Sequence, residues 1–212
     1  LPFIGERDIA LSKVRNLFEH LMRDPSAGLV ILDFSGYRGN LGVSGEINRM
    51  VMALRARGSK VVAYVDDIRL SVLLAAASVD RVVAEPSAHL TWRGLGGNSL
   101  FYKGLLDKIG VKVEFLKHGA YKSAVEPYVA DSMSTEAREN RKELYTDLWQ
   151  SVTSMVAVRN TRQSLGVKRT LDSLASTPVV SASAAVRAGL VDTLLYLDQV
   201  PAYALKSFFD VD

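Results

Sequence analysis

A lysine at position 122 lies in a stretch whose residue types could support nucleophilic catalysis. The stretch runs from Gly119 to Tyr128 and reads Gly-Ala-Tyr-Lys-Ser-Ala-Val-Glu-Pro-Tyr, between an apolar run and a long helical pattern. A lysine amine can act as a general base when burial penalises its charged form and lowers its pKa. A lysine in a loop is nevertheless most often an ordinary surface residue. The residues alone make Lys122 a candidate general base and leave the surface interpretation open.

Two further motifs could do chemistry, but their spacing argues against it. The glycine loop Gly94-Leu95-Gly96-Gly97 lacks both the following Lys-Ser/Thr and the G-x-G-x-x-G spacing of phosphate-binding loops. It is interpreted as a structural turn, or as a backbone-lined loop that a peptide or an oxyanion can approach. Asp66 and Asp67 are neighbours at the end of a predicted strand, where adjacent side chains point to opposite faces. We expect them to form a polar turn, with one aspartate as a helix N-cap, rather than a metal site.

Composition argues against several other kinds of site. The chain has no cysteine, which excludes disulfides and thiolate metal sites, and its three histidines, His20, His89 and His118, lack metal-ligand spacing. No G-x-S-x-G elbow and no evident Ser-His-Asp cluster is present. The net charge is only +3 and the basic residues are scattered. We therefore expect no cofactor, no metal and no nucleic-acid partner.

The elements that must position Lys122 alternate between apolar strands and amphipathic helices. Strands are expected over residues 28–34, 60–65, 80–84, 89–92 and 111–116, and helices over 8–23, 44–57, 68–78, 100–109, 170–175 and 197–208. A long helix is expected from Ser134, an N-cap without the glutamate of a full capping box, to about Gln163. Residues 181–192 read as a short helix followed by a strand-like Leu-Val-Asp. The alternation predicts an α/β fold with a mainly parallel sheet and a long helical arm, in a single domain over residues 1–212.

The lysine stretch also resembles a known motif. Residues 119–128, followed by Met133-Ser134 and by Ala137-Arg138-Glu139, are similar to the lysine motif of the signal peptide peptidase A (protease IV) family. The preceding residues 100–111, the early Asp24-Pro25 with the strand to Asp33, and the tail from Ala185 to Asp192 extend the resemblance over roughly residues 8–200. The tail is similar to that of the wider crotonase and Clp-protease superfamily. The resemblance thus implies a crotonase/Clp-protease-like version of the predicted α/β fold.

The same resemblance implies a Ser-Lys dyad in which a lysine deprotonates a serine and backbone N–H groups stabilise the oxyanion. Lys122 matches the family's lysine, but the position of the family's serine is occupied by Leu70, without the flanking glycines. In the long members of the family, the N-terminal copy of a tandem duplication keeps the lysine and the C-terminal copy supplies the serine. This chain resembles that N-terminal copy. Ser71, one residue further, is a less favoured nucleophile because one helical step turns a side chain by about 100°.

The resemblance also implies partners and a location. Apolar, extended substrates, namely cleaved signal peptides, are expected to bind by strand addition. A second, serine-bearing domain and a homo-oligomer are expected, at the periplasmic side of the bacterial inner membrane. No apolar run in the chain approaches the ~20 residues that span a bilayer, and no signal peptide is visible. The opening Leu1-Pro2-Phe3 reads as an arbitrary start, so we expect a trimmed part of a longer protein.

Two other functions stay open at this point. One is a proteolytically inactive scaffold or peptide-binding module of the same fold. The other is a crotonase-like acyl-CoA enzyme, which is disfavoured because the Lys122 motif is not a CoA signature and the loop after Phe34 lacks obvious acidic catalytic residues.

Overall fold

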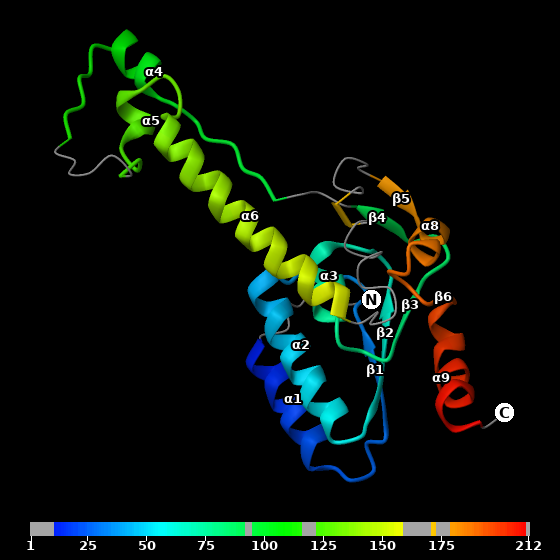
Figure 1. Cartoon of the computed structure of the whole chain (residues 1–212). Coiled ribbons are helices and arrows are strands. Elements are labelled where there is room, and N and C mark those ends of the chain that lie inside the picture. Colours follow the sequence, from blue (N-terminus) through cyan, green and yellow to red (C-terminus); the bar gives the residue numbers. More distant parts are fainter. Residues whose placement is uncertain (1–10, 92–94, 116–121, 159–170, 173–178, 211–212) are drawn as a thin grey trace, which may run out of the picture. The chain divides into compact units, whose positions relative to one another are not determined.

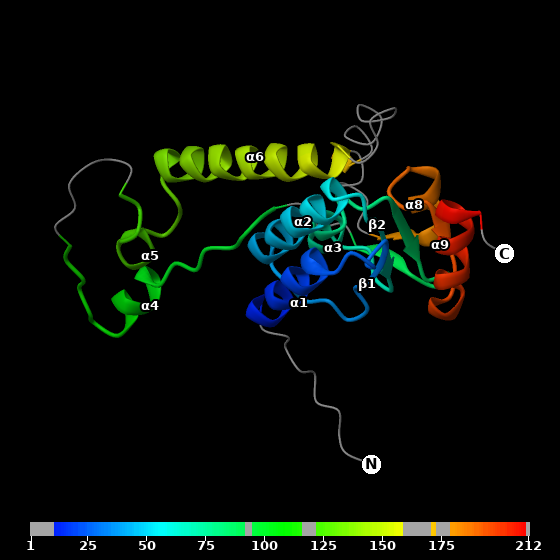
Figure 2. The same cartoon turned by 90° about the horizontal axis from the view of Figure 1, so that it is seen from below.

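The computed structural model describes residues 11–91, 95–115, 122–158, 171–172 and 179–210 (Figures 1 and 2). The chain forms two compact units, which are described separately. Unit 1 comprises residues 1–93 and 153–212, and unit 2 comprises residues 94–152. The single domain expected over residues 1–212 stays a prediction.

Unit 1 begins with two helices and two strands in alternation. Helix α1 (Leu11–Arg23) precedes β1 (Leu29–Asp33), and α2 (Leu41–Ala56) precedes β2 (Lys60–Val65). Helix α2 begins three residues before the expected Ser44, because the side chain of Asn40 caps it by accepting a hydrogen bond from the Val43 N–H at 3.0 Å. Two glycines in its first turns obscure the helical pattern there.

The rest of unit 1 continues with shorter elements. These are α3 (Leu70–Ala75), β3 (Arg81–Ala84), β4 (His89–Thr91), β5 (Val179–Ser181), α8 (Ala182–Arg187), β6 (Thr193–Leu194), a 3₁₀ turn at Leu197–Gln199 and α9 (Val200–Phe209). Helix α3 is shorter than the expected 68–78 because Ile68 instead forms a parallel bridge with Leu90. The strand expected at Leu-Val-Asp lies slightly later, as β6.

The main sheet has the order β1-β2-β3-β6, and each neighbouring pair is parallel. Side chains of Val62, Tyr64 and Val83 form a buried cluster with Val200 and Ala204 of α9, which covers one face of the sheet. Helices α1, α2 and α3 lie on the other side (Figure 2). Because both faces are covered, β2 is buried from Val61 to Val65, which explains its continuous apolar run. The predicted α/β class with a parallel sheet is confirmed.

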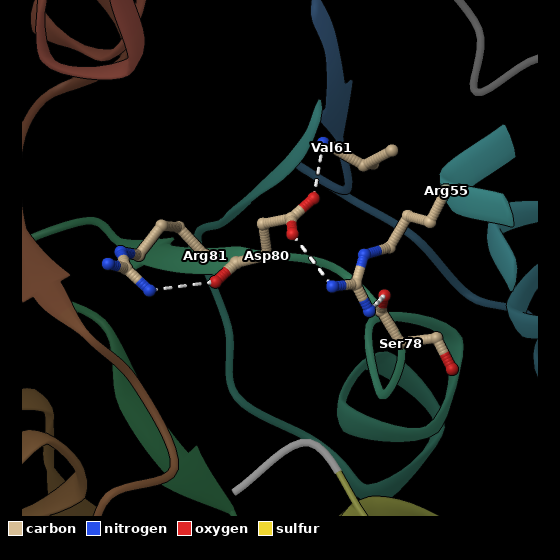
Figure 3. A network of polar contacts seen from close by, with 5 residues as sticks. All are labelled: Arg55, Val61, Ser78, Asp80 and Arg81. Carbon is tan, nitrogen blue, oxygen red and sulfur yellow. Dashed lines mark hydrogen bonds and ion pairs between the residues drawn. The ribbon is translucent and has the colours of Figure 1, made fainter. Parts of the chain in front are cut away.

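In unit 1, a network of polar contacts links α2 to the amino-terminal ends of β2 and β3 (Figure 3). The guanidinium of Arg55 on α2 donates to the Ser78 carbonyl at 2.9 Å and to Oδ1 of Asp80 at 2.7 Å. The other carboxylate oxygen of Asp80 accepts from the Val61 N–H at 2.9 Å. One aspartate therefore joins α2, the turn after α3 and β2.

The described residues of unit 2 form three helices. They are α4 (Lys103–Lys108), α5 (Glu126–Val129) and α6 (Thr135–Val158), whose residues from Thr153 onward belong to unit 1. The expected N-cap of the long helix is confirmed, since Ser134 Oγ accepts from the Ala137 N–H at 3.2 Å. No helix within the described ranges is long and apolar enough to cross a membrane.

One predicted strand does not form, and several other predicted segments lie outside the described residues. Residues 111–115 form no strand, and Val111 and Phe115 are exposed. Their alternating pattern had indicated a half-buried strand, but the sheet pairings assign no partner strand to this segment. Most of the helix expected over 170–175, the end of the long helix beyond Val158, and residues 119–121 of the lysine stretch lie outside the described residues.

Candidate functional site

In unit 1, the loops after β1 and β2 are tied together at the carboxyl edge of the sheet. The backbone N–H of Gly36 donates to Oδ2 of Asp66 at 3.1 Å. From the second loop, Arg69 donates through its guanidinium to the Tyr37 carbonyl at 3.0 Å. Ligand sites of open parallel sheets form at this edge. Here its polar groups bind one another across the two loops.

The two adjacent aspartates have separate partners, as expected from their opposite directions. Asp66 accepts from Gly36, whereas Asp67 forms an ion pair with Nε of Arg69 at 2.9 Å. The prediction that one of them caps the following helix is wrong: the N-cap is Arg69, without a side-chain capping bond. The aspartates support the turn instead. Within the described ranges, no three His, Cys, Asp or Glu side chains gather as a metal site.

Leu70, at the position expected for the family's serine, is the first residue of α3 and is buried. Its hydrocarbon side chain offers no nucleophilic atom and belongs to the core of unit 1. Ser71 follows on the same helix and is partly buried. The role of Ser71 stays an untested alternative.

Lys122, the predicted catalytic residue, lies in unit 2 immediately before the turn that leads into α5, and its side chain is exposed. The described residues around Lys122 therefore leave it open to solvent, without the burial expected around a catalytic lysine. Tyr121, its preceding neighbour, lies outside the described residues. Ser123 is partly buried, and its carbonyl accepts from the Glu126 N–H at 3.0 Å, which closes the turn next to the lysine.

Glu126 is a buried charged residue that sequence reasoning missed. The residue is only 5% exposed. Its two carboxylate oxygens accept hydrogen bonds from Ser134, one from Oγ at 2.6 Å and one from the backbone N–H at 3.1 Å. In a capping box, the glutamate that accepts from the N-cap N–H stands at the third helical residue. That residue is Ala137 here, and Glu126 performs the same task from eight residues before the cap. A search for a displaced capping glutamate could have identified it.

Aromatic rings and a backbone hydrogen bond hold α5 against residues that precede and follow α4. The rings of Tyr102 and Tyr128 stack with centroids 5.9 Å apart, and the ring of Phe115 lies 6.1 Å from that of Tyr128. The Tyr102 N–H donates to the Pro127 carbonyl at 2.6 Å. The Glu-Pro-Tyr part of the lysine stretch is thus fixed by side chain, ring and backbone contacts.

The glycine loop has a structural explanation in unit 2. A Cβ at Gly97 would lie 2.9 Å from Oη of Tyr145 on α6, closer than side-chain carbons normally approach. Nearby, Arg141 of α6 donates to Ser99 Oγ at 2.6 Å. These contacts favour the structural interpretation of the loop. Gly94 lies outside the described residues. His20 and His89 lie on different elements, α1 and β4, and His118 also lies outside the description.

A family model described as Peptidase family S49 matches residues 53–207, a range that includes both Leu70 and Lys122. Protease 4 of Salmonella typhi is 28% identical over 204 residues, which cover 94% of this chain and 33% of that protein. The chloroplastic serine protease SPPA of Arabidopsis thaliana is 23% identical, over 91% of this chain and 28% of that protein. The chain thus spans about a third of the length of these curated relatives, or less.

Two enoyl-CoA enzymes are among the solved structures similar to this chain. An enoyl-CoA hydratase/isomerase (crotonase) from Legionella pneumophila is 15% identical, covers 93% of this chain and 63% of that one, and has a TM-score of 0.46. An enoyl-CoA isomerase from M. smegmatis is 18% identical, with coverage of 93% and 68% and a TM-score of 0.48. At such scores these likenesses carry no argument about activity. The family match extends over most of the chain, and the chain belongs to peptidase family S49, the family expected from its lysine stretch.

Proposed function

We propose that residues 1–212 contribute Lys122 as the general base of a Ser-Lys dyad serine endopeptidase, and that the nucleophilic serine comes from another domain. In this mechanism the neutral amine of Lys122 removes the proton from the serine hydroxyl as the oxygen attacks the peptide carbonyl carbon. The lysine then gives this proton to the departing amine, and water hydrolyses the acyl-enzyme. Backbone N–H groups stabilise the oxyanion.

The observation that carries the proposal is the contrast between Leu70 and Lys122. The expected nucleophile position holds a buried hydrocarbon, whereas the candidate base is exposed. An exposed lysine is accessible to a second protein surface, and that surface would supply the missing desolvation. Exposure is therefore compatible with a base that works only in a composite site.

The proposed substrates are cleaved signal peptides, bound as extended apolar segments. The proposed partners are the serine-bearing domain and further copies of the chain, at the periplasmic side of the inner membrane. Exposed large apolar side chains on unit 2 support an association of this kind, since exposed apolar patches mark protein interfaces. They include Tyr102, Leu105, Ile109, Phe115, Tyr128 and Leu144.

The proposal is tested by assaying cleavage of an apolar peptide with residues 1–212 alone and together with the serine-bearing domain. We expect cleavage only in the combined preparation, and its loss in Lys122→Ala. Lys112→Ala, which removes another exposed lysine of unit 2, is the matched control and should retain activity. Cleavage by residues 1–212 alone that Ser71→Ala abolishes would refute the composite site.

A peptide-binding scaffold is the second candidate, because the burial of Leu70 is equally compatible with a unit that never cleaves. It predicts that Lys122→Ala leaves cleavage by the combined preparation unchanged, while residues 1–212 still bind the peptide. The same assay therefore separates the two functions.

A further inference from the structure

We propose that Glu126 is the positioning residue for Lys122: its buried carboxylate fixes the segment that carries the lysine to the amino-terminal end of α6. The inference rests on the proposed function, because it gives the lysine a support that a general base requires. Glu126 itself touches neither substrate nor reacting atoms in this role.

The first support is the geometry of the carboxylate. Both oxygens bind the same residue, with Oε1 accepting from Ser134 Oγ at 2.6 Å and Oε2 accepting from the Ser134 N–H at 3.1 Å. Ser134 Oγ accepts in turn from the Ala137 N–H at 3.2 Å. The hydroxyl therefore donates towards Glu126 and caps the helix at the same time. Two bonds from one side chain fix direction as well as distance.

The second support is the short chain between Glu126 and the lysine. The Glu126 N–H donates to the Ser123 carbonyl, so the backbone turns once between the anchored carboxylate and Lys122. On the other side, the Ala130 N–H donates to the Glu126 carbonyl at 2.9 Å. Glu126 is thus bound through its backbone N–H, its carbonyl and its side chain, and a shift of this residue shifts the lysine segment.

The third support is electrostatic. A carboxylate that is only 5% exposed is strongly disfavoured unless charge-assisted hydrogen bonds replace water. The amino-terminal end of a helix carries partial positive charge from its free N–H groups, and α6 runs for 24 residues from this point. Glu126 is therefore buried at a position where both of its carboxylate oxygens have hydrogen-bond donors.

The Glu126–Ser134 contact should affect catalysis through the distance between the general base and the proton that it removes. A general base must lie within hydrogen-bond reach of the proton that it removes, and misplacement by about 1 Å can lower a rate by about 10²-fold. Lys122 is exposed and has a flexible side chain, so its backbone position is the part that the protein can fix. Loss of the Glu126–Ser134 contact should therefore lower kcat and leave peptide binding, measured as KM, nearly unchanged.

The constants kcat and KM are measured on the preparation that combines this chain with the serine-bearing domain. We expect Glu126→Gln to lower kcat by on the order of tenfold or more, with KM changed by less than about twofold. Ser134→Ala, which removes the hydroxyl contact, should lower kcat in the same direction, and Ser134→Thr, which keeps a hydroxyl, should restore it. Asp131→Asn removes an exposed carboxylate from the same unit and should change neither constant.

A control for helix capping separates positioning from stability. Ser181→Ala removes the N-cap of α8, where Ser181 Oγ accepts from the Ala184 N–H at 3.3 Å, without touching the lysine segment. It should lower the thermal midpoint comparably to Ser134→Ala but leave kcat unchanged. Equal losses of kcat in Ser181→Ala and Ser134→Ala would overturn the positioning role.

Amide hydrogen exchange supplies a readout that does not depend on activity. In residues 1–212, Glu126→Gln should accelerate exchange of the Glu126 position and of Tyr128 and Ala130, and leave β2 and β3 unchanged. Unchanged exchange at these amides, or unchanged kcat despite faster exchange, overturns the inference. If instead Lys122→Ala keeps full activity, the proposed function fails, and the exchange result still reports whether Glu126 holds the segment.

Discussion

Arg69 donates a hydrogen bond from its guanidinium to the backbone carbonyl of Tyr37 at 3.0 Å, joining the turn before α3 to the loop after β1. Its Nε lies 2.9 Å from Oδ2 of Asp67. The same arginine thus supports both loops beside the buried Leu70. Together with the bond from the Gly36 N–H to Asp66, it links the loops after β1 and β2 at the carboxyl edge of the sheet.

Arg69 is expected to contribute measurably to the stability of the fold. Arg69→Ala removes the bond to the Tyr37 carbonyl and leaves Asp67 without its cation, so unfolding free energy should fall by about 1–3 kcal/mol. Arg38→Ala, which removes an exposed arginine from the loop after β1, is the matched control and should change it by less than about 0.5 kcal/mol. Urea unfolding of the three proteins measures both values, and equal midpoints for the two variants would contradict the account.

Gly39 is required by the ring of Tyr37. A Cβ at position 39 would fall 1.9 Å from Oη and 2.2 Å from Cζ of Tyr37, so the ring would have to leave its place. Its hydroxyl, which lies 3.0 Å from Ser44 Oγ, would lose that partner. We expect Gly39→Ala to lower the unfolding free energy by about 1–3 kcal/mol. Gly28→Ala introduces a Cβ that meets nothing within 4 Å and should have a much smaller effect on the same measurement.

The network of Figure 3 predicts a cost for neutralising Asp80. Asp80→Asn keeps the size of the side chain but weakens the bonds from Arg55 and from the Val61 N–H, which are charge-assisted in the native protein. We expect the unfolding free energy to fall by about 1.5–3 kcal/mol. Asp147→Asn, at an exposed position of α6, is the control. A midpoint for Asp80→Asn that equals that of the control would show that the network contributes nothing measurable.

The phenol of Tyr37 makes the free energy of unfolding depend on pH in the alkaline range. Burial raises the pKa of its phenol above the ordinary value of 10.0, and the hydrogen bond with Ser44 opposes this in part. Above pH 10.0 the unfolded chain therefore loses the proton more readily than the folded one, so stability is present at lower pH and is lost as pH rises through the folded pKa. Burial also raises the pKa of Tyr64, which acts in the same direction.

The measurement is urea unfolding of the native protein and of Tyr37→Phe at pH values below and above 10.0. Stability of Tyr37→Phe should fall less steeply with pH than that of the native protein. Tyr196→Phe, at an exposed position, should keep the native slope. Parallel lines for the native protein and Tyr37→Phe would contradict the assigned cause.

The parallel sheet could be predicted from the sequence because its inner strands, β2 and β3, are buried on both faces. The run Val61–Val65 is continuous in apolar residues, and the strand β2 has the predicted bounds, Lys60–Val65. The strand expected over residues 111–116 does not form, because no neighbouring strand pairs with this segment. Alternation at Val111, Val113 and Phe115 indicates a strand only where a neighbouring strand is available, and pairing is a tertiary property.

The candidate site was predictable only in part for a similar reason. Lys122 and the leucine at position 70 follow from motif resemblance, which depends on residue types and spacing. Glu126 acts through a contact with Ser134, eight residues further on, and no local propensity reports that pairing. The expected N-cap role of an aspartate at 66 or 67 also failed, because each carboxylate found a partner outside the helix.

The central claim is that Lys122 acts on a serine that residues 1–212 do not contain. A fluorophosphonate probe, which reacts with activated serine hydroxyls, should be applied to this chain combined with the serine-bearing domain, and the labelled residue identified by mass spectrometry. The account predicts a label on a serine of the other domain, its loss in Lys122→Ala, and its retention in Lys112→Ala. A label on Ser71, or labelling that is unchanged in Lys122→Ala, would contradict it.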